Sequence, residues 1–263
     1  MFRETGGGEK TTEINKYKII TWNVRGLGTC TKRYRVLSMM KRLGVKIACL
    51  QETHLTDTEA EKLKKKWKGQ LYAVNYSSYA RGTAIWIAPG TPFKMKHMEG
   101  DAVGRYVVVR GELDGLEIVL VNSYGPNIDD ERFYSKIQEH LAGDLGISLL
   151  WAGDYNCVLN GNLDRTPPKI GTKPKMTTNL GQVIYNLNLN DIWRSQHPAK
   201  QEYTCHSSTH NTYSRLDRIY VTGDISQLVI DAKILSRYIS DHSPMLMEIQ
   251  WGFKPINRNM WTM

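Results

Sequence analysis

The sequence predicts an α/β fold, and three observations support that class. Apolar strands alternate with amphipathic helical segments from about residue 17 to residue 251. The chain has 263 residues, 41% of them hydrophobic, which is enough to bury a sizeable core. Asp114-Gly115 is a typical two-residue hairpin turn between two such strands. We therefore expect an α/β domain in which sheet dominates.

The first part of the chain has a β-α-β pattern. Residues 17–22 form a run of β-branched and aromatic side chains that ends in a turn. Residues 31–44 carry apolar side chains at helical spacing, and a buried strand follows at 45–50. Thr56 or Asp57 is expected to cap the next helix, whose lysines we interpret as a solvated face rather than a DNA site.

The alternation continues to the end of the chain, interrupted by a Pro/Lys-rich loop at 166–175. We expect strands at 71–76, 83–88, 106–113, 116–123, 148–152 and 244–251, a hairpin of 202–206 with 213–221, and helices at 129–142 and 177–188.

One domain over residues 17–251 is the economical interpretation, because no repeat or interior linker interrupts the pattern. Residues 1–16 are polar and Gly/Lys-rich and are expected to be a disordered lead. Residues 252–263 are expected to begin a linker to a missing downstream region.

Composition narrows the class of partner. The net charge of +9 and the pI near 9.3 favour a polyanion such as nucleic acid. General solubility, an acidic membrane or a ribosomal neighbour would explain the charge as well. Four separated cysteines argue against a zinc knuckle or disulfide scaffold and are expected to be intracellular thiols. No run approaches the ~20 apolar residues of a membrane span, so no membrane partner is expected.

Polar side chains stand where the predicted strands end, which is where sheets present sites. They are Asn23, Glu52, Tyr124, Asp154, Asn156, Asp217, Asp241 and His242. Each one alone would be interpreted as a turn former or a cap. Together they suggest a site for phosphate chemistry.

Three of these positions carry specific chemistry. Glu52 emerges directly from an apolar strand, and its carboxylate suits Mg2+, which takes only one or two protein carboxylates. Asp154 and Asn156 stand two residues apart, so an extended strand would place a base and a phosphate donor on the same side. His242 needs an acceptor to orient its ring, and Asp217 is the candidate.

Six ordered motifs now carry a family resemblance. They are TWNVRG at 21–26, QET at 51–53, NSYGP at 122–126, GDYN at 153–156, RLDRI at 215–219 and SDH at 240–242. In this order they resemble the motifs of the endonuclease/exonuclease/phosphatase family. The resemblance implies a DNase-I-like, four-layer α/β/β/α sandwich of two mixed β-sheets flanked by helices.

The resemblance also implies roles for the metal and phosphate ligands. Glu52 would bind Mg2+, with Mn2+ as a substitute, and Asn23 and Asp241 would lie near the metal and its waters. Tyr124 and Asn156 would contact the scissile phosphate.

The remaining residues would carry out catalysis. Asp154 would orient or deprotonate the attacking water. His242, held by Asp217, would bind phosphate and stabilise the transition state.

Further segments resemble the N-terminal endonuclease of LINE-type non-LTR retrotransposons, in particular NLDR at 162–165, EYT at 202–204 and TYSRLD at 212–217. That branch nicks one strand of double-stranded genomic DNA in the nucleus, leaving a 3′-hydroxyl that primes reverse transcription. Asn259-Met260-Trp261 resembles the start of the region that leads to the reverse transcriptase, so the chain is expected to continue into one.

Two departures argue against an abasic-site repair enzyme. Arg25 stands where the repair branch commonly carries an acid, which also leaves the number of metal ions open. Thr204 and Ser214 stand where that branch lines its abasic pocket with aromatic residues. A repair nuclease or general DNase, a phosphatase of small phosphoesters or lipids, and an inactive DNA- or RNA-binding module remain the alternatives.

The expected DNA contacts centre on the tip of a hairpin at 206–212, whose small polar side chains suit a minor groove. An ordinary mobile hairpin loop is the alternative interpretation. The expected DNA contacts are Arg25, Arg165, Thr204, His206, His210, Asn211, Ser214 and Arg215. Lys169, Lys173 and Lys175 would contact phosphates or simply be solvated.

Overall fold

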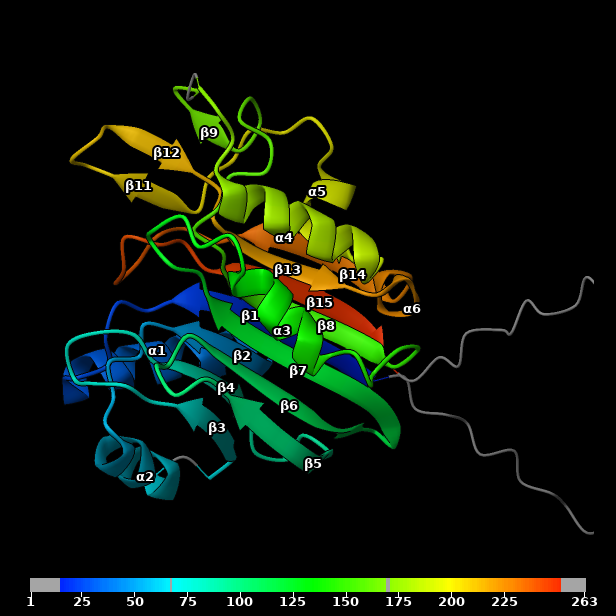
Figure 1. Cartoon of the computed structure of the whole chain (residues 1–263). Helices are drawn as coiled ribbons and strands as arrows, with labels where there is room; N and C mark the ends of the chain where they lie inside the picture. The colour runs from blue at the N-terminus through cyan, green and yellow to red at the C-terminus, as the bar shows by residue number, and fades with distance from the viewer. Residues whose placement is uncertain (1–14, 67, 169–170, 252–263) are drawn as a thin grey trace, which may run out of the picture.

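Two six-stranded β-sheets pack face to face, and helices cover both outer faces (Figure 1). The computed structural model describes residues 15–66, 68–168 and 171–251. The four-layer α/β/β/α sandwich expected from the motifs is confirmed. Among the described residues, no helix is long and apolar enough to cross a membrane.

The first sheet has the strand order β14-β15-β1-β2-β4-β3. Its strands are β1 (Asn15–Asn23), β2 (Val45–Gln51), β3 (Gln70–Val74), β4 (Thr83–Ile87), β14 (Val229–Ile234) and β15 (Met245–Trp251). β1 and β2 run parallel, and the other neighbours are antiparallel. Helices α1 (Cys30–Leu43) and α2 (Asp57–Lys66) lie on the outer side of this sheet (Figure 1).

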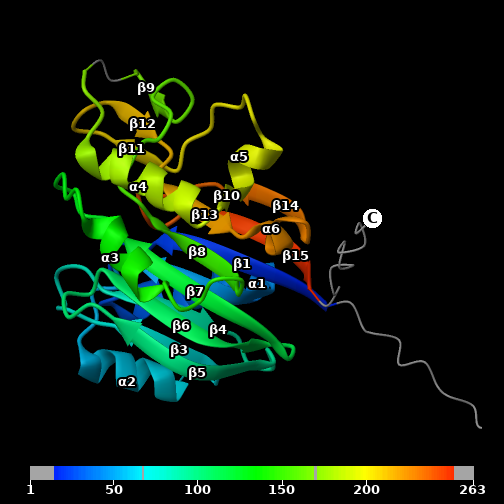
Figure 2. The same ribbon diagram turned by 45° about the vertical axis from the view of Figure 1, so that its right-hand side comes forward.

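The second sheet has the order β10-β13-β8-β7-β6-β5. Its strands are β5 (Phe93–Gly100), β6 (Tyr106–Leu113), β7 (Leu116–Tyr124), β8 (Ser148–Asp154), β10 (Asn190–Asp191) and β13 (Asp217–Val221). β7 and β8 are the parallel pair. Helices α3 (Phe133–His140) and α4 (Lys175–Asn186) cover its outer face, as Figure 2 shows from a second side.

A small third sheet stands off one edge of the sandwich (Figures 1 and 2). It consists of β9 (Arg165–Thr166), β11 (Cys205–Ser207) and β12 (Thr212–Ser214) in the order β11-β12-β9. The short helix α5 (Ile192–Gln196) follows β10 in the sequence, and the short helix α6 (Gly223–Ser226) follows β13.

The main core lies between the two large sheets. Ile19 and Ile47 from the first sheet and Leu120 and Leu150 from the second are fully buried there. Alternate residues of the same strands face outward and pack under the helices, so the sheets are apolar on both faces. This burial makes the strands rigid platforms, and their ends are fixed relative to one another.

Several local expectations are confirmed. Thr56 and Glu59 form a reciprocal capping box at the start of α2. Asp114 and Gly115 both have positive φ, 51° and 79°, as a type I′ hairpin turn between β6 and β7 requires. The helix expected at 31–44 is α1, which starts one residue earlier at Cys30, where the Thr29 side chain caps it, and ends at Leu43, with Gly44 as the C-cap.

Other expectations are corrected. The run 213–221 is not one strand, because it is interrupted between Ser214 and Asp217 and its halves pair in different sheets. β5, β14, α5 and α6 were not expected. The proposed linker at 252–263 lies outside the described residues, as does the proposed lead except for residues 15 and 16, which begin β1.

Candidate active site

The carboxyl ends of the two parallel strand pairs meet at one edge of the sandwich. Asn23 ends β1, and Glu52 directly follows β2. Tyr124 ends β7 beside Asp154, the last residue of β8. Gly153 permits this close pairing, since an added Cβ would lie 2.2 Å from the Ser123 carbonyl oxygen. Packing of the two sheets therefore brings side chains from distant parts of the sequence together.

Asn23 connects the two halves of the site. Its Nδ2 donates to Glu52 Oε1 and to Asp154 Oδ2, both at 2.9 Å. Its Oδ1 accepts from the backbone N–H of Arg25 at 3.0 Å, which fixes the amide orientation. A buried amide that holds two carboxylates sets their separation.

Glu52 offers hard oxygen donors for a cation. Burial by itself would raise the pKa of Glu52, but hydrogen bonds from His54, Asn23 and Tyr124 outweigh it and lower the pKa to about 2. The side chain is 21% exposed, so an ion can approach from the open side. An ionised, partly accessible carboxylate fits a magnesium-type ion, which prefers oxygen ligands and retains waters.

Asp154 is suited to act as a base. Its carboxylate is buried and accepts from the backbone N–H of Asn156 at 3.0 Å. Burial raises the pKa of Asp154, and the positive charge of His242 only partly opposes that rise. A carboxylate with a raised pKa accepts a proton from water more readily than a typical aspartate.

His242 is held between two carboxylates. Nδ1 lies 2.8 Å from Asp217 Oδ2, and Nε2 lies 3.8 Å from Asp154 Oδ2. Burial would lower the pKa of His242, but Asp217 and then Asp154 raise it well above the usual range. The two carboxylates therefore favour the protonated, positively charged form of the imidazole.

These three side chains have donor atoms within 4.8 Å of one another, a spacing that a metal ion would also allow. The protonated ring disfavours a cation there, because it already supplies the charge that balances Asp154 and Asp217. Glu52 is the better candidate for a metal ligand.

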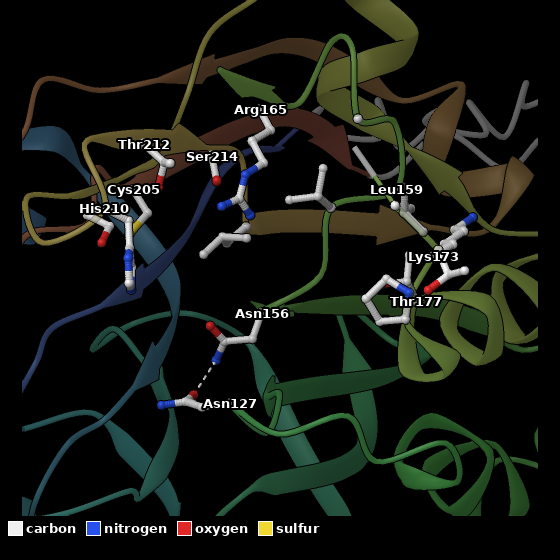
Figure 3. Close-up of a pocket in the computed structure, with 17 residues that line it drawn as sticks. Asn127, Asn156, Leu159, Arg165, Lys173, Thr177, Cys205, His210, Thr212 and Ser214 are labelled. Atoms are coloured by element: carbon white, nitrogen blue, oxygen red, sulfur yellow. Dashed lines mark hydrogen bonds between the residues drawn. The ribbon is translucent and has the colours of Figure 1, made fainter. Parts of the chain in front are cut away.

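Tyr124 is buried beside Glu52, and Asn156 is half-buried and lines the adjacent cavity. Burial, and then the charge of Glu52, raise the pKa of Tyr124, which keeps its hydroxyl protonated as a donor. Asn156 Nδ2 donates to Gly125 O at 2.7 Å and to Asn127 Oδ1 at 3.0 Å (Figure 3). Both side chains can donate to an anionic oxygen after a small rotation.

Asp241 lies on the first-sheet side of the site, in an ion pair with Arg25. Arg25 Nη1 is 2.5 Å from Asp241 Oδ2, and the two side chains are 64% and 34% exposed. The adjacent Ser240 hydroxyl donates to Asn23 O at 2.7 Å, which ties this loop to the end of β1.

Four non-glycine residues of the site have left-handed backbone conformations. These are Arg25, Glu52, His54 and Asn156, with φ between 47° and 50°. Each costs about 1 kcal/mol or more, and such strain persists only where surrounding bonds hold it. Here the loops clamp each other, since Gly26 N–H donates to Glu52 O at 2.6 Å and His54 N–H donates to Arg81 O at 2.9 Å.

A cavity of about 750 Å³ opens beside the cluster, between the β11–β12 hairpin and the start of α4 (Figure 3). Asn156 and Cys205 connect it to the catalytic side chains, because Cys205 pairs with His242 through an isolated β-bridge. Arg165, His210 and Ser214, three of the expected DNA contacts, line this cavity.

The remaining expected contacts on the hairpin lie at or near its tip. Asn211 is exposed in the turn at φ 45°, and the His206 ring stacks on Tyr213 at 4.3 Å. Lys173 and Lys175 flank Pro174 at the start of α4, and Lys173 lines the cavity. Lys169 lies outside the described residues.

The structure corrects two of the expected DNA contacts. Arg215 is 1% exposed, and its guanidinium donates to Asp164 and Asp191. Thr204 is 2% exposed, and its hydroxyl accepts from the backbone N–H groups of Leu216 and Asp217. Both side chains hold the base of the hairpin and do not face solvent.

Three residues near the site were missed by the sequence analysis. His54 Nε2 lies 3.2 Å from Glu52 Oε2, and Arg105 lies 4.8 Å over the Tyr124 ring. Lys32 Nζ donates to Arg25 O at 2.8 Å. A signal existed for Arg105, because it directly precedes β6, whose pairing with β7 places it beside Tyr124.

The arrangement combines a base, an imidazole between two carboxylates, two neutral donors and an ionised metal-type ligand in one cluster. Such a set can activate water and stabilise negative charge on phosphorus. It suits hydrolysis of a phosphoester.

Known proteins resemble this chain in sequence and in fold. The profile described as "Endonuclease/Exonuclease/phosphatase family" matches residues 20–242. The "Transposon TX1 uncharacterized 149 kDa protein" of Xenopus laevis is 26% identical over 230 residues, which cover 86% of this chain and 17% of that protein. The chain thus spans about one sixth of that relative's length.

Solved structures agree with the fold. The AP endonuclease LMAP from Leishmania major has a TM-score of 0.74 at 22% identity, covering 89% of this chain and 88% of its own. A 3′ phosphatase, NExo from Neisseria, bound to a product DNA hairpin, has a TM-score of 0.72 at 20% identity, covering 89% and 100%. On the profile match, which includes most of the chain, this protein belongs to the endonuclease/exonuclease/phosphatase family.

Proposed function

We propose that the chain is a metal-dependent DNA endonuclease that nicks one strand of duplex DNA and leaves a 3′-hydroxyl. The observation that carries this proposal is the clustering of Glu52, Asp154 and His242 at one edge of the sandwich. Asn23 joins the first two directly. Membership of a nuclease and phosphatase family supports the reaction class.

In the proposed reaction, Asp154 accepts a proton from water as the water oxygen attacks phosphorus. The P–O3′ bond breaks, and the leaving 3′-oxygen takes a proton from solvent. His242 donates to a non-bridging oxygen and offsets the growing negative charge, while Asp217 keeps its ring in place. Tyr124 and Asn156 would orient the phosphate.

Glu52 would hold the cation, with Asn23 and Asp241 close to it and to its waters. Mg2+ is the proposed ion, with Mn2+ as a substitute, because the donors are oxygens. A bound divalent cation supplies positive charge to the phosphate and to the leaving oxygen.

The cavity beside the β11–β12 hairpin supports a DNA substrate. Arg165 and Ser214 line one wall, and His210 projects from the hairpin (Figure 3). Arg25 is exposed at the edge of the catalytic cluster. His206 and Asn211 would add hairpin contacts, and the net charge of +9 favours a polyanion.

The biological setting that we propose is retrotransposition, in which the 3′-hydroxyl primes reverse transcription. The similarity to a much longer transposon protein of Xenopus laevis supports this setting. A reverse transcriptase would then belong to the same full-length protein, and the nicking would take place in the nucleus.

Incubation of supercoiled plasmid with Mg2+ tests the proposal. The wild-type chain should convert it to the open circle. Asp154→Ala and His242→Ala should abolish conversion while DNA binding, measured by a gel shift, remains. Asp231→Ala, which removes an exposed carboxylate on β14, is the matched control and should nick normally. Unchanged nicking by both site variants would refute the assigned roles.

A repair nuclease is the second candidate, because abasic-site endonucleases share the fold. Matched duplexes with and without one abasic site separate the two. Cutting of intact DNA at least as fast as abasic DNA supports the proposed function. A strong preference for the abasic duplex would favour repair.

A further inference from the structure

The acids at the site are almost all engaged with protein donors. Asp217 pairs with His242, and Asp154 accepts from Asn23 and lies 3.8 Å from the same imidazole. Asp241 pairs with Arg25. Glu52 accepts from Asn23 and lies 3.2 Å from His54 Nε2, and with its side chain 21% exposed it is the carboxylate of the cluster formed with Asp154 and Asp217 that an ion can approach from solvent.

Both the backbone and the side chain of Arg25 make hydrogen bonds at the site. Its backbone N–H donates to Asn23 Oδ1 at 3.0 Å, and its carbonyl accepts from Lys32 Nζ at 2.8 Å. Its guanidinium meets Asp241 Oδ2 at 2.5 Å and is otherwise exposed. The main chain of Arg25 is therefore held in place, and its guanidinium, in a side chain that is 64% exposed, is paired with Asp241.

A second positive charge reinforces the first. Burial lowers the pKa of Lys32, whereas Asp241 and Glu52 both oppose that change. The ammonium of Lys32 donates to Arg25 O at 2.8 Å and so stands next to the ion pair of Arg25 with Asp241. Two acids and two protein cations occupy this side of the site, which leaves little net negative charge for metal ions.

The positive charges of Arg25 and Lys32 oppose the binding of a second divalent cation on this side of the site. A second divalent ion at Asp241 would have to displace Arg25 and approach Lys32, and repulsion opposes both steps. The guanidinium can do what a second ion would do at that place, because its free N–H groups face solvent, where a phosphate oxygen can accept from them.

We propose that the site binds one divalent cation, at Glu52, and that the Arg25 guanidinium takes the place of a second cation at Asp241. The inference rests on the proposed function only in taking Glu52 as the metal ligand. It adds the stoichiometry and the residue that sets it.

Titration of the free protein with Mn2+, followed by the electron paramagnetic resonance signal of unbound Mn2+, tests the proposal without any DNA. The wild-type chain should bind one Mn2+, and Glu52→Gln should lose that site. Arg25→Asp adds a carboxylate next to Asp241, so it should bind two. Arg25→Gln should keep one site with affinity tighter by about threefold or more, because a neighbouring positive charge is gone. Arg35→Gln removes an exposed charge on α1 and should match the wild type.

Two tight Mn2+ sites in the wild-type chain, or none, would overturn the inference. So would an Arg25→Asp protein that is folded by circular dichroism and still binds one ion. Should that variant be unfolded, Arg25→Gln decides, and an affinity equal to that of the wild type counts against the proposal. A wild-type chain that binds one Mn2+ but never nicks plasmid would refute the proposed function and leave this inference standing.

Discussion

Replacing Asp217 by Asn tests the role of the buried histidine. Asp217 Oδ2 and His242 Nδ1 are 2.8 Å apart, with side chains 0% and 9% exposed, so solvent does not screen them. A hydrogen bond between charged groups contributes about 1.5–3 kcal/mol. If that stabilisation acts mainly on the charged imidazole, the nicking rate at neutral pH should fall about 10-fold to 150-fold.

The nicking rate should also depend on pH in a direction that follows from the pKa shifts of Asp154 and His242. In the wild type, the rate should rise as Asp154 ionises and fall at alkaline pH as His242 loses its proton. Without Asp217 the pKa of His242 drops, because burial then dominates. The alkaline fall should therefore move to lower pH in Asp217→Asn.

The free energy of unfolding should also depend on the protonation of His242. The folded-state pKa of His242 is raised, so its contribution to stability is full below the unfolded-state pKa and disappears as pH rises through the folded-state pKa. The free energy of unfolding of Asp217→Asn should thus differ most from the wild type in mildly acidic solution and least in alkaline solution.

Single-turnover nicking of plasmid across a pH series, with urea unfolding at the same pH values, measures both effects. Asp231→Asn is the control, since it removes an exposed carboxylate on β14. An Asp217→Asn protein with the wild-type rate and the wild-type alkaline limb would refute the reasoning.

Three further predictions concern other parts of the molecule. Asp164→Ala removes one of the two carboxylates, Asp164 and Asp191, that pair with the buried guanidinium groups of Arg215 and Arg218, so urea unfolding should show a loss of about 3–5 kcal/mol. A loss below about 1 kcal/mol would contradict that role. Arg165→Ala should weaken binding to all DNA sequences alike and reduce the salt slope, measured by fluorescence anisotropy, by about 1. An unchanged slope would show that Arg165 does not contact phosphate. Excess chelator should stop plasmid nicking, and added Mg2+ or Mn2+ should restore it. Nicking that persists in chelator would argue against a metal ligand at Glu52.

The sequence was most informative where a polar residue ends an apolar strand. Asn23, Tyr124 and Asp154 each do so, and the alternation around them reveals the strands. Buried parallel strands leave few alternatives for where their carboxyl ends lie. The candidate site and the α/β class could therefore both be predicted.

Edge strands were missed for a physical reason. β5, with Lys94 and Lys96 exposed among few apolar residues, faces solvent along much of its length and lacks the buried pattern that marks a strand. β14 likewise lies at a sheet edge, with Ile230 exposed. Such strands are held by backbone pairing with a neighbour, which the local sequence does not show.

Arg215 illustrates a different limit. A basic residue in a candidate DNA-binding hairpin resembles a phosphate contact until its partners are known. Asp164 and Asp191, the partners, lie 51 and 24 residues away in the chain. Only the folded arrangement shows that the charge is already neutralised.

The small third sheet has a consequence for how such a protein can diversify. Its strands β11 and β12 pair with each other, and β12 pairs with β9. The base of the hairpin is fastened to the sandwich by the bridge from Cys205 to His242 and by the bonds of Thr204 to Asp217 and of Arg215 to Asp191. Replacement of residues 206–213 would leave the ladders of both large sheets intact. The hairpin segment that faces the cavity can therefore change in sequence without disturbing the catalytic side chains, which lie at the ends of the strands of the two large sheets.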